Sequence, residues 1–88
     1  MSIEDSRAEI DSIDKELIRL LNMRARLAIK VGESKKTKGL SLCDREREHE
    51  ILERICRFNT GPLDERAVIK LFRRIIYESR RIEARFVE

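Results

Sequence analysis

Two cationic side chains, Arg24 and Lys35, stand eleven residues apart on one face of an apolar helical pattern. An α-helix with 3.6 residues per turn points both in nearly the same direction, so their charged groups could converge on one small anion. Arg24 lies midway between Leu20 and Leu27, where a buried guanidinium is costly unless an anion pairs with it. The alternatives are an Arg24 stem that follows the apolar face out to solvent and a Lys35 that only offsets a helix dipole.

The last third of the chain carries two polar residues on its own apolar face. Ser79 falls between Ile75 and Ile82, and Glu83 follows Ser79 by about one helical turn. A buried carboxylate there needs a partner or a proton. The alternatives are a Ser79 hydroxyl that bonds back to the preceding turn and a Glu83 at the solvated end of the helix.

Arg45 and Glu46 form a further candidate pair between these two segments. Arg45 precedes Leu52 by about two helical turns, which places it on the inner face of a helix, beside Glu46. The alternative is an ordinary charge pair in the first turn of that helix.

The sequence lacks the residues that a zinc site, a phosphate-binding loop or a catalytic nucleophile would need. His49 with Cys43 and Cys56 matches no zinc spacing and has no fourth ligand. The chain contains neither a Gly-rich phosphate loop nor a nucleophile with a plausible base. We therefore expect no metal, no cofactor and no covalent catalysis, and we interpret His49 as a solvated helix residue.

The basic residues of the chain are interspersed with acidic ones. Twenty Lys and Arg against seventeen Asp and Glu leave a net charge of +3. The pairs Arg73-Arg74 and Arg80-Arg81 have acidic neighbours and no interleaved aromatic residues, so we interpret them as a solvated face. We expect no nucleic-acid partner, although the small positive excess favours anionic ligands.

Length and composition favour one domain over residues 1–88. Charged residues make up 42% and apolar residues 41%, a mixture typical of charge-rich amphipathic helices. The two cysteines form no CxxC motif, and no apolar run reaches the length of a signal-peptide core or a membrane span. We therefore expect a soluble, cytoplasmic protein without a membrane partner.

Three helices must position the candidate residues. Apolar residues recur at spacings of three and four from Ile10 to Val31, which predicts a first helix over about 2–36. A second is predicted from about Asp44 to Phe58 and a third from Asp64 to Phe86. No segment alternates with the period of a β-strand. The predicted fold is all-α, with three helices of unequal length.

The first helix is too long for a globule of this size. It would extend roughly 50 Å, whereas a globule of this length has a radius of gyration of only about 12 Å. Its apolar face continues along nearly the whole length, so the overhanging part would be exposed unless a second chain covers it. We expect an obligate dimer. The alternative is a bend at Gly32, which would shorten the overhang.

Taken together, three segments resemble the all-helical (AroQ) class of chorismate mutases. They are the run Ile10–Leu21 followed by Arg24, Leu27-Ala28, Val31-Gly32 and Lys35, then Arg45-Glu46-Arg47, and then Leu71–Ser79. The match covers residues 7–86 in the order of the family.

This resemblance implies an intertwined helical homodimer that isomerises chorismate to prephenate by a Claisen rearrangement, without metal or cofactor. Such an enzyme serves the shikimate pathway and the biosynthesis of Phe and Tyr. The resemblance also implies that Arg24 and the partner subunit's Arg7 grip the two substrate carboxylates, and that Lys35 reaches the ether oxygen and a carboxylate. Geometry agrees, because roughly 25 Å of straight helix separates Arg7 from Arg24 in one chain.

By the same resemblance, Glu46 accepts a hydrogen bond from the ring hydroxyl and Arg45 adds positive field. Ser79 supports the carboxylate side, and Glu83 stands where the family has a Gln or Glu that donates to the ether oxygen.

Two positions depart from the family pattern. Glu83 stands where bacterial members often have Gln, which changes the expected pH dependence. Leu42 stands where many members carry an aspartate three residues before the Arg-Glu pair, and Asp44 is a candidate to replace it. Two other functions are compatible with the scaffold. An isochorismate pyruvate-lyase would use much of the same polar set. A non-catalytic helical dimerisation module would need inward-facing Arg24, Arg45 and Glu83 to be accidental.

Overall fold

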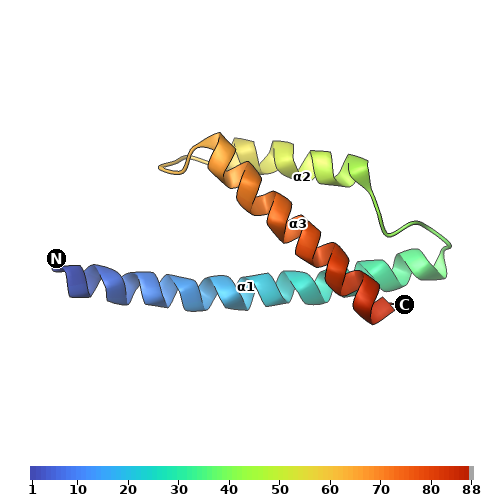
Figure 1. The fold of residues 1–88 in the computed structure, drawn as a ribbon, viewed down its shortest axis with the longest axis horizontal. Helices are drawn as coiled ribbons and strands as arrows, with labels where there is room; N and C mark the ends of the chain where they lie inside the picture. Colours follow the sequence, from blue (N-terminus) through green and yellow to red (C-terminus); the bar gives the residue numbers. More distant parts are fainter. Residues whose placement is uncertain (88) are drawn as a thin grey trace.

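The computed structural model describes residues 1–87, which form three α-helices (Figure 1). They are α1 (Ile3–Thr37), α2 (Arg45–Phe58) and α3 (Glu65–Val87). No strand occurs in this part of the chain, so the prediction of an all-α fold with three helices of unequal length is confirmed. Glu88, the last residue of the predicted domain, lies outside the described residues.

Short polar side chains cap the start of each helix. The Ser2 hydroxyl accepts from the Asp5 amide at 3.0 Å, and the Ser2 amide donates to the Asp5 carboxylate at 3.1 Å. This reciprocal pair satisfies two amides that a helix start otherwise leaves without partners. Asp44 caps α2 by accepting from the Arg47 amide, and Asp64 plays the same part at the start of α3. These are the three starts that the sequence pattern indicates.

α1 runs without a break through Gly32, so the helix is not shortened there. The molecule is elongated, with a longest dimension of 54 Å and a radius of gyration of 15.9 Å, against about 12 Å for a globule of this length. The N-terminal end of α1 extends beyond the other two helices (Figure 1). Its apolar side chains are exposed there, Ile13 by 59%. The predicted overhang of the first helix is therefore present.

α3 packs against both of the other helices. It crosses between α2 and α1 and contacts both, whereas no close backbone contact links α1 to α2 within residues 1–87 (Figure 1). Its buried side chains are Val68, Ile76, Glu83 and Val87, which form one stripe along the helix. The small core therefore includes a carboxyl group.

Gly32 marks the closest approach of α3 to α1. A Cβ at Gly32 would lie 3.1 Å from Val87 Cγ2 and 3.3 Å from Glu83 Cγ, which is tighter than an ordinary van der Waals contact. The missing side chain therefore lets the end of α3 pack directly against the backbone of α1. Lys36 Nζ donates to the Val87 carbonyl at 2.8 Å and holds the same end of α3 in place.

The Gly32→Ala substitution tests this contact. Alanine favours a helix by about 1 kcal/mol over glycine, but overpacking a tight contact costs about 1–3 kcal/mol. We expect the free energy of unfolding, measured with urea at a fixed protein concentration, to fall by about 1 kcal/mol. Ser34→Ala, at an exposed position of the same helix, is the control and should be neutral or slightly stabilising. A Gly32→Ala protein as stable as the wild type would contradict the close contact.

Candidate functional site

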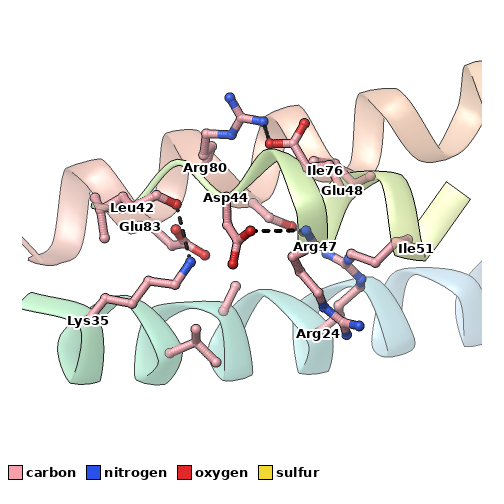
Figure 2. Close-up of a pocket in the computed structure, with 13 residues that line it drawn as sticks. Arg24, Lys35, Leu42, Asp44, Arg47, Glu48, Ile51, Ile76, Arg80 and Glu83 are labelled. Atoms are coloured by element: carbon pink, nitrogen blue, oxygen red, sulfur yellow. Dashed lines mark hydrogen bonds and ion pairs between the residues drawn. The ribbon is translucent and has the colours of Figure 1, made fainter. Parts of the chain in front are cut away.

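A pocket of about 230 Å³ lies among the three helices (Figure 2). α1 lines it with Arg24, Ala28, Val31 and Lys35, at spacings of four, three and four residues. These spacings put all four on one helical face. Arg24 and Lys35 are therefore in the same pocket, as their spacing in the sequence predicts, and Figure 2 shows them at its opposite ends.

Arg24 is held by a hydroxyl group of α3. Its Nη1 donates to Ser79 Oγ at 2.5 Å, while Ser79 Oγ donates its own proton to the Ile75 carbonyl at 2.9 Å. Ser79 thus bonds back to the preceding turn and also lines the pocket. Burial lowers the pKa of Arg24, and the nearby charge of Arg47 adds to this, while Glu83 acts in the opposite direction. Because its partner is neutral, the Arg24 guanidinium keeps its charge available for an anionic ligand.

Lys35 connects α1 to the loop before α2. Its Nζ donates to the Leu42 carbonyl at 3.3 Å, and the Glu83 carboxyl group lies close by across the pocket (Figure 2). An ammonium group has three donors, so the one that holds the loop leaves others to reach a ligand.

Glu83 is a buried acid at the centre of this arrangement. It is 8% exposed and is the one buried charged or polar residue among those described. Burial raises its pKa above the ordinary glutamate value, against the opposing charges of Lys35, Arg80 and Arg24. The carboxyl group therefore holds its proton to a higher pH than an exposed glutamate does. In its protonated form it can donate a hydrogen bond into the pocket.

The α2 wall of the pocket differs from the prediction. Arg45 and Glu46 are exposed and do not line the pocket, whereas Asp44, Arg47 and Glu48 do. The prediction placed Leu52 on the pocket face, but Ile51 lines the pocket instead. Arg47 and Glu48 precede Ile51 by four and three residues and therefore share its face, which excludes Arg45 and Glu46.

Asp44 stands three residues before Arg47 and lines the pocket with Arg47 and Glu48. These three residues therefore have the spacing that the resemblance implies for an aspartate and an Arg-Glu pair. Leu42 lines the pocket too, and its carbonyl holds Lys35.

Arg7 lies away from its own chain's pocket, as the helix geometry predicts, whereas the placement of Arg80 differs from the prediction. Arg7 is exposed on α1, roughly 25 Å from Arg24, and does not line this pocket. Arg80, which the sequence pattern places on a solvated face, lines the pocket and forms an ion pair with Glu48. The signal for Arg80 was its position four residues after Ile76 and three before Glu83, both buried.

An apolar groove of about 900 Å³ adjoins the pocket and shares Arg24 and Ser79 with it. Leucines of α1 and apolar side chains of α3 line most of it, namely Leu17, Leu20, Leu21, Leu71, Phe72, Ile75 and Ile82. Much of the α1 apolar face therefore opens onto this groove instead of packing within the chain.

The remaining candidates of the sequence lie apart from the pocket. His49 pairs with Glu53 on the exposed surface of α2, and both cysteines are free. Across the described chain, no cluster of three or more His, Cys, Asp or Glu side chains is arranged to hold a metal ion. None of the three helices combines the length and the apolar character needed to cross a membrane.

Comparison with known proteins gives a consistent match to one family. Residues 6–84 match the family model described as chorismate mutase type II. A bifunctional chorismate mutase/prephenate dehydratase of Aquifex aeolicus is 42% identical over 78 residues, which are 84% of this chain and 22% of the relative. The chain thus spans about a fifth of that bifunctional protein. A chorismate mutase of Methanocaldococcus jannaschii is 32% identical over 87 residues, covering 98% of this chain and 88% of the relative.

Solved structures share the fold. A chorismate mutase of Thermus thermophilus superposes with a TM-score of 0.92 at 35% identity, over 94% of each chain. A chorismate mutase of Helicobacter pylori, in complex with prephenate, gives a TM-score of 0.88 at 28% identity, over 97% of this chain and 92% of the other.

The raised pKa of Glu83 predicts a pH-dependent gain of stability in Glu83→Gln. Below the ordinary glutamate pKa, the wild-type carboxyl group is protonated in both folded and unfolded chains. As the pH rises, the unfolded chain ionises first, so the wild type loses stability until the pH passes the folded-state pKa. We expect the melting temperature of Glu83→Gln minus that of the wild type to be larger at pH 8 than at pH 4.

Glu33→Gln, which makes the same change at an exposed position of α1, is the matched control. A difference for Glu83→Gln that is equal at both pH values would contradict the raised pKa.

Proposed function

The chain belongs to the chorismate mutase type II family, and we propose that it catalyses the Claisen rearrangement of chorismate to prephenate. The observation that carries this proposal is the pocket in which Arg24 and Lys35 face the buried Glu83. The prephenate complex of the Helicobacter pylori relative supports the same class of ligand for this pocket.

The reaction matches the chemistry that these side chains offer. The rearrangement is unimolecular, so the protein needs only to hold the substrate in a compact conformation and to stabilise negative charge that grows on the ether oxygen. Cationic and hydrogen-bonding side chains suffice for both tasks. Lys35 donates to the ether oxygen and a carboxylate, and Arg24, fixed by Ser79, binds a carboxylate.

Glu83 donates the second hydrogen bond to the ether oxygen. Only the protonated carboxyl group has a proton to give, and a carboxylate would repel the developing charge. The raised pKa of this group supports its role as a donor.

The α2 side of the pocket recognises the rest of the substrate. Glu48 accepts a hydrogen bond from the ring hydroxyl and Arg47 adds positive field. The resemblance in sequence alone implies these roles for Glu46 and Arg45. Asp44 lies beside them at the helix cap, near the same hydroxyl region.

A second copy of the chain completes the site. The exposed apolar face of α1 and the groove against α3 need a cover, and the groove reaches Arg24. Arg7 is too distant to serve its own pocket, so an intertwined homodimer supplies the partner subunit's Arg7 to the second substrate carboxylate. The free thiols of Cys43 and Cys56 support a cytoplasmic enzyme, because thiols stay reduced in that compartment.

Incubation of the purified protein with chorismate tests the activity. We expect prephenate as the product, and a loss of roughly a hundred- to a thousandfold in rate for Arg24→Met, because a preorganised donor is removed. Arg26→Met, an exposed arginine of the same helix, is the control and should retain activity. Unchanged chorismate would contradict the proposal. If a parallel incubation with isochorismate releases pyruvate while chorismate stays unchanged, the protein is a lyase instead.

Subunit mixing tests the shared site. Arg7→Ala and Arg24→Ala proteins are each expected to be inactive, but a mixed dimer has one pocket with both arginines intact. After complete exchange we expect about a quarter of wild-type activity, since half of the dimers are mixed and each has one intact site of two.

A mixture of Arg24→Ala with Lys35→Ala is the control for subunit mixing. Both residues belong to the same chain's pocket, so no mixed dimer contains an intact site and activity should stay absent. Recovery in the control, or none in the test mixture, would refute a site built from two chains.

A further inference from the structure

Arg80 forms the one ion pair that joins two helices in residues 1–87. Its Nη2 pairs with Glu48 Oε2 on α2, whereas every other ion pair of this part of the chain lies within a single helix, three or four residues apart. Arg80 Nη1 also donates to Cys43 Sγ in the loop before α2, at 3.9 Å. Figure 2 shows the Arg80–Glu48 pair on the wall of the pocket.

This pair lies where the pocket wall has little other support. No close backbone contact joins α1 to α2 in the described residues, so the first turn of α2 is positioned through α3 and through the loop that Lys35 holds. Arg80 links α3 to both Glu48 and the loop. The direction of the Glu48 carboxylate therefore depends on Arg80.

The pair also sets the charge that a ligand meets. Glu48 lines a pocket whose cations, Arg24 and Lys35, are suited to a dicarboxylate, and a free Glu48 carboxylate would repel such a ligand. Arg80 neutralises it. The side chains are 40% and 28% exposed, so a pair of this kind contributes little to global stability. Its effect should therefore be found in binding.

We propose that Arg80 is a positioning residue of the active site, which orients Glu48 toward the substrate hydroxyl and neutralises it so that a dianionic substrate can bind. The inference rests on the proposed mutase function and requires no direct contact between Arg80 and the substrate.

The first experiment compares Arg80→Gln, Arg80→Lys and Arg73→Gln in steady-state conversion of chorismate. Arg73 is an exposed arginine of the same helix that lines neither cavity, so its change controls for lost charge. We expect Arg80→Gln to raise KM roughly tenfold, with a smaller effect on kcat. Without Arg80, the negative Glu48 carboxylate would face the anionic ligand in a partly solvated site. Arg80→Lys should restore much of the affinity, and melting temperatures should stay close to the wild type.

A double-mutant cycle tests whether Arg80 acts through Glu48. In a Glu48→Gln background, Arg80→Gln should raise KM much less than it does in the wild type, because no carboxylate remains to orient or neutralise. An equal effect in both backgrounds would overturn the inference, as would a KM for Arg80→Gln that matches Arg73→Gln.

Prephenate binding by titration calorimetry separates this inference from the proposed function. A wild-type protein that does not convert chorismate would refute the function. Weaker binding of prephenate to Arg80→Gln than to Arg73→Gln would still support the role of Arg80 in admitting a dicarboxylate. Equal prephenate affinities would overturn that role, whether or not the wild type is active.

Discussion

The packing of the last turns of α3 against α1 at Gly32 determines how the α1 and α3 walls of the pocket meet. It removes the Glu83 carboxyl group from water and brings it beside Lys35 and Arg24, two cations of a different helix. A side chain at position 32 would force the Val87 and Glu83 side chains to shift at the point where the acid is buried. The same approach places Ser79, one turn earlier on α3, against Arg24. The close packing of α3 side chains against the α1 backbone at Gly32 thus brings together the polar groups that α1 and α3 contribute to the pocket.

That arrangement balances two electrostatic effects on one carboxyl group. Burial favours the protonated acid, while the cations needed to bind a dianion favour the carboxylate. In the proposed reaction a dianionic substrate would bring negative charge that offsets the cations, so its binding would favour the protonated, donating form of Glu83. Acid, cations and ligand are therefore coupled. Arg80 belongs to the same balance, because its charge acts on Glu83 while its guanidinium is paired with Glu48.

Helices and their buried faces could be predicted from the sequence because apolar spacing is a local property. A local pattern also indicates the pocket residues of α1 and α3, because each of them breaks or extends an apolar stripe. They are Arg24, Lys35, Ser79 and Glu83. The sequence does not indicate which α2 residues line the pocket, because Arg45-Glu46 and Arg47-Glu48 are consecutive pairs of the same type. The rotation of α2 about its axis decides which pair faces inward. That rotation is set by packing against α3. The role proposed for Arg80 depends on a partner 32 residues away in the sequence, which no local pattern indicates.

The most direct test of this account is the pH dependence of kcat/KM for the wild type and Glu83→Gln. If Glu83 donates a hydrogen bond to the ether oxygen, wild-type kcat/KM falls as the pH rises through its ionisation, whereas glutamine donates over the whole range. The account predicts a flat alkaline side and higher activity there for Glu83→Gln. An alkaline fall that is the same in both proteins would contradict it, because a group other than Glu83 would then be losing the proton.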